Sequence, residues 1–325
     1  MNIAIVGCGF IGEKRARSLG ECRLVACTDI VPERALEFAR KRPSVEATSN
    51  WRTVVGRPDV DIVIVTATHD ALAEVSLAAI RAGKHVLVEK PAARSAAELG
   101  PVIAAATEKK VLVRVGFNHR YHPSFVKARE IVASGQLGDL MFIRGRYGHG
   151  GRVGYENEWR AVKELSGGGE LIDQGTHLID LARSFLGDFS EIQGFAHTYF
   201  WNMPVEDNGF MLLKTPKKQV ALLHASWTEW KNTFSFEIYG KNAKLDISGL
   251  GGSYGVERLA YYKMLPQMGP PETVIWEYPM PDRSWDVEFA EFVEDIRLGR
   301  QPAVGLEDAR AALEIVKRIY EESNI

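Results

Sequence analysis

Three short segments of the chain combine residue types that can carry out chemistry, and the first is rich in glycine. Gly7, Gly9 and Gly12 form a G-x-G-x-x-G pattern that follows an apolar run and opens a helical stretch. Such glycines permit a tight turn and the close approach of a pyrophosphate, while the helix start offers unpaired N–H groups. The alternative is a glycine turn that binds no nucleotide. The pattern predicts a dinucleotide loop with contacts from Gly7, Gly9, Phe10, Ile11 and Gly12.

An acidic residue bears on which dinucleotide is bound. Asp29 stands 17 residues after Gly12, at the end of the second expected strand. A carboxylate there accepts hydrogen bonds from ribose hydroxyls and repels a 2′-phosphate. The sequence therefore predicts NAD, with NADP less favoured. NADP stays open because Lys14 or Arg15 could reach a 2′-phosphate.

The second segment contains a lysine at the end of an expected strand. Lys90 follows the apolar stretch 85–88 and lies between Glu89 and Pro91. Open parallel sheets bind ligands outside the carboxyl ends of their strands. Pro91 restricts Lys90 to an extended backbone, and the bond between them could be cis. A lysine there can protonate or orient a substrate oxygen; the alternative is a solvated lysine that ends a strand.

The third segment has three glycines at 167–169, followed by Asp173, His177 and Asp180. If a helix begins near residue 172, Asp173 and His177 lie one turn apart on one face. A carboxylate near an imidazole fixes its tautomer and supports its charged form, which makes His177 a candidate acid or base. Helix capping by Asp173, a packed histidine and a metal pair are the alternatives. We predict no metal site, because no further His or Cys set has ligand spacing.

These segments need elements to position them, and the first third of the chain alternates strands with helices. Strands are expected at 3–6, 23–28, 61–66, 85–88 and 111–116, with helices after most of them. This rhythm predicts a doubly wound parallel sheet. From about residue 138 the pattern changes to strands joined by short turns, which favours antiparallel pairs. These strands are expected at 140–147, 191–200, 209–214, 219–227, 233–239 and 244–247.

The predicted fold class is therefore α/β: an N-terminal Rossmann domain and a C-terminal α+β domain with an open, mostly antiparallel sheet. We predict a nucleotide-binding domain at 1–120 and a domain for substrate binding and oligomerisation at 121–325. The last helix, at about 306–322, is a candidate for packing back on the first domain.

Composition bounds the classes of function. The 325 residues suit about two domains, and 40 basic against 42 acidic residues give a net charge of −2. That balance argues against a nucleic-acid partner. No apolar run reaches the roughly 20 residues of a membrane span, and the apolar start lacks the basic region of a signal peptide. Three cysteines form no disulfide framework, so we expect a cytoplasmic protein without a membrane partner.

Taken together, the motifs resemble those of the Gfo/Idh/MocA oxidoreductases, the family of glucose–fructose oxidoreductase and inositol dehydrogenase. The resemblance covers essentially the whole chain. It rests on four segments in this order: the glycine loop 7–12, the A-G-K-H-V-x-x-E-K-P stretch 82–91, the G-F-N-x-R segment 116–120 and the D-x-G-x-H-x-x-D pattern 173–180. The combination is far more specific than any single motif.

The resemblance implies hydride transfer between a nicotinamide and a secondary alcohol or ketone of a sugar, cyclitol or nucleotide-linked sugar. By its motifs it implies that Lys90, Asp173 and His177 are catalytic. We hypothesise that His177 removes the hydroxyl proton, that Lys90 binds the same oxygen and the nicotinamide ribose, and that Asp173 orients the groups or balances the charge. Asn118 and Arg120 would face the substrate, and Glu89 and Lys90 the cofactor.

One departure from the family pattern follows the third strand. The family often has a Thr-Pro pair there and then a loop with histidine, whereas this chain reads Thr66-Ala67-Thr68-His69. Thr66, Thr68 and His69 are expected to contact the cofactor. The alternative for His69, which we favour over a catalytic role, is a residue that starts a helix.

A basic, aromatic and glycine-rich stretch at 146–160 is the remaining candidate. Tyr147, Arg152 and Trp159 are expected to bind substrate, since aromatic rings stack on sugars and arginine grips phosphates. That interpretation favours an activated or phosphorylated sugar, and a mobile surface loop is the alternative.

Two other functions stay open beside the dehydrogenase. One is a redox-neutral glycosidase that uses NAD, and the other is a catalytically silent sugar sensor. The presence of Lys90, Asp173 and His177 together argues against the sensor. The resemblance also implies a homodimer or homotetramer formed through the C-terminal sheet.

Overall fold

The computed structural model describes residues 1–267 and 269–325, which form two compact units. Unit 1 comprises Met1–Phe117, Glu164–Gly167 and Trp285–Leu313, and unit 2 comprises Asn118–Lys163, Gly168–Ser284 and Glu314–Ile325. Short segments from later in the chain therefore belong to the N-terminal unit. The division into domains at 1–120 and 121–325 stays a prediction.

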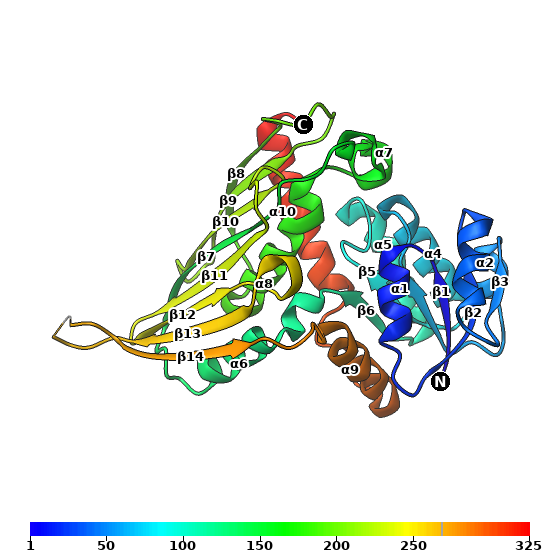
Figure 1. The fold of residues 1–325 in the computed structure, drawn as a ribbon, viewed down its shortest axis with the longest axis horizontal. Helices are drawn as coiled ribbons and strands as arrows, with labels where there is room; N and C mark the ends of the chain where they lie inside the picture. Colours follow the sequence, from blue (N-terminus) through cyan, green and yellow to red (C-terminus); the bar gives the residue numbers. More distant parts are fainter. Residues whose placement is uncertain (268) are drawn as a thin grey trace. The chain divides into compact units, whose positions relative to one another are not determined.

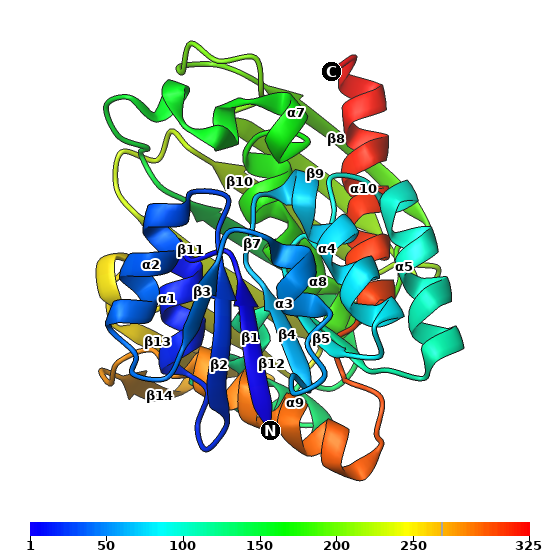
Figure 2. The ribbon, with the colours of Figure 1, turned by 90° about the vertical axis from the view of Figure 1, so that its right-hand side faces the viewer.

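Unit 1 contains a six-stranded, entirely parallel sheet with the order β3-β2-β1-β4-β5-β6 (Figure 2). Its strands are nearly continuous apolar runs buried on both faces, as expected where helices cover both sides. The doubly wound parallel sheet is confirmed. The strands are β1 (Asn2–Val6), β2 (Arg23–Thr28), β3 (Glu46–Thr48), β4 (Ile62–Val65), β5 (His85–Glu89) and β6 (Val113–Gly116).

The helices of unit 1 connect these strands, and α4 packs beside α5 (Figure 2). Sequence reasoning missed the short elements β3 and α3. Late in the chain, α9 adds Phe289 and Phe292 to the core cluster that contains Ile3 and Ile5. The helices are α1 (Phe10–Arg17), α2 (Pro32–Arg40), α3 (Trp51–Val55), α4 (His69–Arg81), α5 (Ala96–Lys109) and α9 (Ser284–Leu298, in unit 1 from Trp285), with the first part of α10 (Leu306–Ser323).

Unit 2 contains an eight-stranded sheet with the order β14-β13-β12-β11-β7-β10-β9-β8 (Figure 1). The β7–β10 pair is parallel and the other neighbours are antiparallel, which confirms the mostly antiparallel sheet. Sequence reasoning missed β13 and β14. The strands are β7 (Leu140–Gly148), β8 (Glu191–His197), β9 (Asn208–Lys214), β10 (Val220–Ser226), β11 (Thr233–Gly240), β12 (Ala243–Ser248), β13 (Glu257–Lys263) and β14 (Glu272–Tyr278).

Alternation along these strands gives the sheet one buried face. In β11, Phe234, Phe236 and Ile238 are buried while the residues between them are half exposed. Helix α8 packs on β7 and β10, where a Cβ on Gly145 would lie 3.3 Å from Leu178 of the helix. The helical elements are α6 (Pro123–Ala133), α7 (Lys163–Ser166), α8 (Thr176–Leu186), the 3-10 turns η1 (Asn118–Tyr121), η2 (Tyr155–Asn157), η3 (Trp159–Ala161) and η5 (Gly252–Tyr254), and the π-helix η4 (Leu171–Gly175).

Two further properties concern the described residues as a set. Within 1–267 and 269–325, no helix is both long and apolar enough to cross a bilayer. Among the same residues, no three or more His, Cys, Asp or Glu side chains are grouped as ligands for a metal ion.

Candidate active site

The glycine loop joins β1 to α1, and each of its three glycines does something different. Gly7 has φ +103°, and a Cβ there would lie 2.5 Å from the Thr66 carbonyl oxygen. A Cβ on Gly12 would overlap the Gly7 carbonyl, so Gly12 lets the helix pack on the loop. A Cβ on Gly9 would meet nothing within 4 Å. Gly9 thus leaves open space before the N-terminus of α1, which fits a pyrophosphate.

The side chains of Phe10 and Ile11 complete the loop. Phe10, the first residue of α1, is 74% exposed, and Ile11 follows it half buried. The ammonium of Lys14 lies 4.9 Å from the centre of the Phe10 ring. These residues leave the start of α1 accessible to a ligand.

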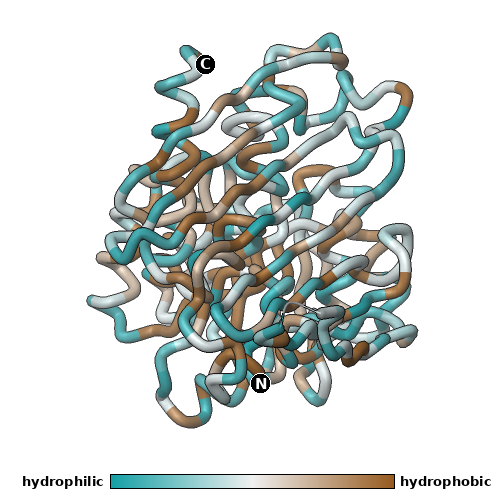
Figure 3. The backbone as a smooth tube through the Cα atoms, turned by 90° about the vertical axis from the view of Figure 1, so that its left-hand side faces the viewer, coloured by the Kyte–Doolittle hydropathy of each residue, from teal (hydrophilic) through white to brown (hydrophobic). Residues whose placement is uncertain are grey.

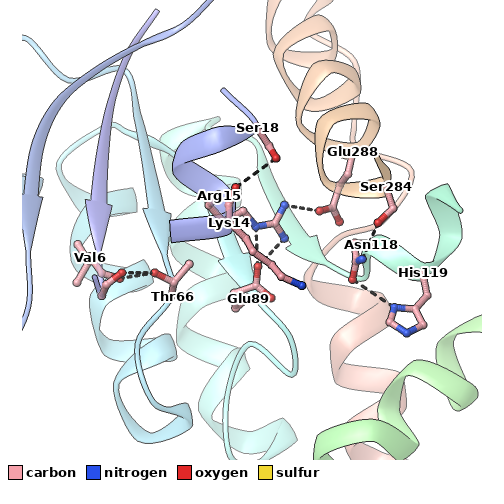
Figure 4. A network of polar contacts seen from close by, with 11 residues as sticks. Val6, Lys14, Arg15, Ser18, Thr66, Glu89, Asn118, His119, Ser284 and Glu288 are labelled. Carbon is pink, nitrogen blue, oxygen red and sulfur yellow. Dashed lines mark hydrogen bonds and ion pairs between the residues drawn. The ribbon is translucent and has the colours of Figure 1, made fainter. Parts of the chain in front are cut away.

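Thr66, at the end of β4, braces the glycine loop. Its Oγ1 donates a hydrogen bond to the Gly7 carbonyl at 2.6 Å and lies 3.2 Å from the Val6 carbonyl (Figure 4). The hydroxyl proton is therefore used within the protein. A contact between Thr66 and a cofactor stays a prediction.

Asp29 follows β2 and is only 8% exposed. Its Oδ2 accepts from the Cys8 amide at 2.7 Å, and its Oδ1 accepts from the Val31 amide at 2.9 Å. The carboxylate ties the glycine loop to the turn after β2. Each oxygen has a further lone pair that can accept from a ribose hydroxyl.

The structure removes Arg15 as a ligand for a 2′-phosphate. Its side chain is buried in unit 1 and points to Glu89 and Glu288, away from solvent (Figure 4). Of the two cations considered for a 2′-phosphate, Lys14 remains, and its ammonium lies 5.1 Å from the centre of the Trp285 ring.

Thr68 and His69 begin α4. The Thr68 hydroxyl donates to Asp70 at 2.6 Å, and His69 is the first residue of the helix. The buried His69 ring places Nδ1 2.8 Å from the Ser166 carbonyl, so it joins the helix start to segment 164–167 of the same unit. These contacts agree with the interpretation of His69 as a helix-start residue.

Lys90 directly follows β5 and precedes a cis peptide bond to Pro91. Lys90 is half buried, whereas the preceding Glu89 is buried. Glu89 was expected to contact the cofactor, but its Oε1 accepts from Arg15 Nε at 2.6 Å. Glu89 is therefore held by an ion pair beside Lys90.

In unit 2, two histidine rings stack. His177 of α8 and His119 of η1 have ring centres 3.8 Å apart, with an angle of 25° between the planes. Tyr147 of β7 lies 5.2 Å from His119 and 6.2 Å from His177, measured between ring centres. All three residues are buried. His177 therefore has a fixed ring plane among aromatic neighbours.

Asp173 lies in the π-helix that leads into α8. Its Oδ2 accepts from Arg160 Nε at 2.8 Å, and the Arg160 guanidinium lies 4.6 Å from the centre of the Trp159 ring. Single π-turns within helices often occur at functional sites. Asp173 and His177 thus lie in the same helical segment of unit 2, and the Asp173 carboxylate is paired with Arg160.

Asn118 and Arg120, both expected to bind substrate, are already engaged by protein groups. Asn118 Nδ2 donates to Ser284 Oγ at 2.8 Å, and its Oδ1 lies 3.3 Å from His119 Nδ1 (Figure 4). Arg120 grips Asp180 with two hydrogen bonds of 2.7 and 2.6 Å. Asn118 therefore orients His119, and Arg120 neutralises the second acid of the helix.

Burial sets the protonation of the phenols and of one imidazole near this cluster. Burial raises the pKa of Tyr147 well above its usual value and that of Tyr254 to about 12. It also raises the pKa of Tyr155, and it lowers the pKa of His149. At neutral pH these groups are neutral hydrogen-bonding partners, suited to hydroxyl-rich molecules.

Arg152 and Trp159 lie in the loop after β7. The Arg152 side chain is largely exposed and pairs with Glu158 at 2.5 Å. Trp159 belongs to η3 and is half buried.

A buried glutamate, Glu206, anchors the start of the helical segment. Its carboxylate accepts from the amides of Gly169 and Leu171 at 2.9 and 3.0 Å and from the Tyr320 hydroxyl at 2.7 Å. A Cβ on Gly168 would overlap that hydroxyl. At Gly168 the missing side chain therefore makes room for Tyr320.

Sequence reasoning missed His119, Tyr254 and Glu206, and did not assign Arg160 a role. His119 stands at the variable position of the 116–120 motif, so the motif itself gave no signal. A buried Glu206 in a loop has no periodic pattern to reveal it.

Two models of known protein families match this chain, one in its N-terminal part and one in its C-terminal part. A model of the GFO/IDH/MocA C-terminal domain matches residues 125–246, and a model described as "Oxidoreductase family, NAD-binding Rossmann fold" matches residues 1–117. The chain belongs to the Gfo/Idh/MocA oxidoreductase family. It is an oxidoreductase of a family whose N-terminal domain binds NAD, which confirms the resemblance drawn from the four motifs.

Several members of the Gfo/Idh/MocA family are similar to this chain. Levoglucosan dehydrogenase of Pseudarthrobacter phenanthrenivorans is 30% identical over 230 residues, which are 66% of this chain and 58% of that protein. Inositol 2-dehydrogenase of Salmonella typhimurium is 28% identical and covers 93% of this chain and 88% of its own. A solved levoglucosan dehydrogenase in complex with NADH and levoglucosan superposes with a TM-score of 0.87 at 24% identity, covering 99% and 98% of the two chains. This last likeness supports the fold.

Proposed function

We propose that this oxidoreductase transfers a hydride between NAD(H) and a secondary alcohol or ketone of an uncharged sugar or cyclitol. The choice of an uncharged substrate rests on the ion pairs between arginines and carboxylates in unit 2. In unit 2, Arg120 faces Asp180, Arg160 faces Asp173 and Arg152 faces Glu158. A phosphate on the substrate would have to displace a carboxylate from one of these guanidinium groups. This replaces the expectation of a phosphorylated or activated sugar.

The neutral groups around the histidine pair support the same class of substrate. Tyr147 and Tyr254 keep their phenolic protons at neutral pH, and the positive charge of Arg160 is paired with the carboxylate of Asp173. Hydroxyls, amides and aromatic faces are the partners that polyols use in proteins. The names of the two curated relatives, which refer to levoglucosan and inositol, agree with an uncharged polyol.

The proposed roles follow the chemistry of the reaction. Bound nicotinamide supplies the acceptor for the hydride that leaves the carbinol carbon. His177 takes the hydroxyl proton, and its ring is held in place by the stack on His119. The family resemblance assigns Lys90 a hydrogen bond to the same oxygen, and the Asp173 carboxylate, which Arg160 holds in place, balances the positive charge that develops on His177.

The first experiment measures NADH formation with matched pairs of substrates. The uncharged substrates are levoglucosan, myo-inositol and glucose, and the charged partners of glucose are glucose 6-phosphate and UDP-glucose. Each reaction is followed by absorbance near 340 nm. Turnover of an uncharged member with little turnover of its phosphorylated partner supports the proposal. A preference for a phosphorylated or nucleotide-linked sugar contradicts it. With no NADH formed, mass spectrometry of glycoside substrates tests for the redox-neutral glycosidase.

We also propose a homo-oligomer formed through the open face of the eight-stranded sheet. Apolar and polar stretches alternate along the strands on this side of the unit (Figure 3). By register Phe195 opposes Phe210, and Leu212 opposes Leu222, and all four are exposed. Light scattering of the native protein and of Leu222→Glu tests this, with a dimer or tetramer expected to dissociate in the variant. A monomeric native protein contradicts it.

A further inference from the structure

A fully buried arginine connects three elements of unit 1. Arg15, in α1, is 1% exposed and directs its Nε to Glu89 at 2.6 Å and its Nη1 to Glu288 of α9 at 2.5 Å (Figure 4). Its guanidinium also lies 4.3 Å from the centre of the Trp285 ring. One cation therefore holds two buried carboxylates, one of which belongs to the residue immediately before Lys90.

The neighbouring strand is shaped around this ion pair. A Cβ on Gly116, at the end of β6, would lie 2.6 Å from Arg15 Nη2 and 3.0 Å from both Glu89 carboxylate oxygens. Gly116 also pairs with Glu89 in the parallel ladder between β5 and β6. Two interactions thus fix the end of β5. The backbone of Glu89 pairs with β6, and the side chain of Glu89 is held by the Arg15 guanidinium.

The same helix, α9, contains a second ion-pair group that serves as an internal reference. Arg114 of β6 is also fully buried, and its Nη2 lies 2.5 Å from Asp295 and 2.9 Å from Glu291. Each buried arginine therefore has two carboxylates, at least one of them from α9. Only the Arg15 group includes a residue next to Lys90.

We infer that Glu288 is a positioning residue for catalysis: by orienting Arg15 it fixes Glu89, and through Glu89 it fixes the backbone that presents Lys90. This inference rests on the role of Lys90 in the proposed function. Without Glu288, Arg15 keeps Glu89 but loses the carboxylate that aligns its other nitrogen. The ion pair then rotates more freely, and the end of β5 with it. Misplacing a catalytic group lowers the rate without weakening cofactor binding.

Two alanine variants of α9 separate positioning from general loss of stability. Glu288→Ala leaves Arg15 with Glu89, and Asp295→Ala leaves Arg114 with Glu291. Asp295 also accepts from Arg300 at 2.6 Å, so its loss removes at least as many contacts. We expect Glu288→Ala to lower kcat by about tenfold, with a nearly unchanged Kd for NADH, and Asp295→Ala to leave kcat close to that of the native protein. Glu288→Gln, which keeps an acceptor for Arg15, is expected to recover most of kcat.

A spectroscopic readout keeps the test independent of substrate. Lysines are methylated with ¹³C-formaldehyde, and the Lys90 signal is assigned by its absence in Lys90→Arg. We expect this signal to move in Glu288→Ala and to keep its position in Asp295→Ala. Equal effects of the two variants on kcat, or an unmoved Lys90 signal in Glu288→Ala, would overturn the inference. If no substrate is turned over, the proposed function fails and the signal alone decides on the positioning role.

Discussion

At the scale of single residues, the stacked imidazoles lead to the sharpest prediction. His177 can exchange a proton, while His119 holds its ring plane from 3.8 Å. Replacing His177 by Ala is expected to lower kcat by about 10²–10⁴-fold, since a general base contributes about that much. The Kd for NADH should stay nearly unchanged. His119→Phe is the matched control because it keeps a stacking ring, and steady-state kinetics should show a much smaller loss. Equal losses in both variants would argue that His119 is itself the proton acceptor.

We expect Asp29 to set the preference between NAD and NADP. Of Lys14 and Arg15, Lys14 is the one left to attract a 2′-phosphate, because Arg15 is buried in its ion pairs. We expect the native protein to bind NADH at least about tenfold more tightly than NADPH, because a charge repulsion of about 1.4 kcal/mol suffices. Asp29→Ala should weaken NADH binding and bring the two affinities closer, as seen in fluorescence titrations. Stronger binding of NADPH by the native protein would contradict the assignment of NAD.

At the scale of elements, Glu206 links the loop after β8 to the helical segment that contains Asp173 and His177. It satisfies two amides at the start of that segment and the Tyr320 hydroxyl of α10. Tyr320→Phe removes one donor and should lower the free energy of unfolding by about 1 kcal/mol. Glu206→Ala leaves the two amides without this acceptor and should cost about 3 kcal/mol or more. Urea unfolding measures both, and equal small losses would show that the carboxylate does not anchor the segment.

Elements of this kind also show how far the sequence reaches. The parallel sheet was predictable because β1 and β4 are apolar throughout, and the antiparallel sheet because short turns join its strands. The glycine loop was predictable because its backbone requirements are local. Contacts such as Glu89 with Arg15 were not, since they join residues 74 positions apart and leave no periodic trace. A motif indicates that Glu89 matters, and only the fold shows which group it faces.

At the scale of the whole molecule, each unit contains a buried acid that binds a proton in the folded state as the pH falls below about 7. Burial raises the pKa of Glu206 in unit 2 and of Glu288 in unit 1 to about 7, from an ordinary value of 4.5. Between pH 4.5 and 7 the folded protein therefore binds protons that the unfolded chain has released. Each group lowers the free energy of unfolding as the pH rises through this window, by up to about 3 kcal/mol.

Salt-bridged carboxylates with lowered pKa values, such as Glu13 and Glu237, act in the opposite direction at lower pH, so the test compares variants. Glu206→Gln and Glu288→Gln place a group that does not titrate where the protonated acid stands. Relative to the native protein, each variant should gain stability from pH 5 to about pH 7 in urea unfolding, and the gain should level off above that pH. Glu294→Gln, an exposed position on α9, is the control and should show no such trend. A stability difference that stays constant with pH would mean that these acids are ionised throughout and that their hydrogen bonds outweigh the cost of burial.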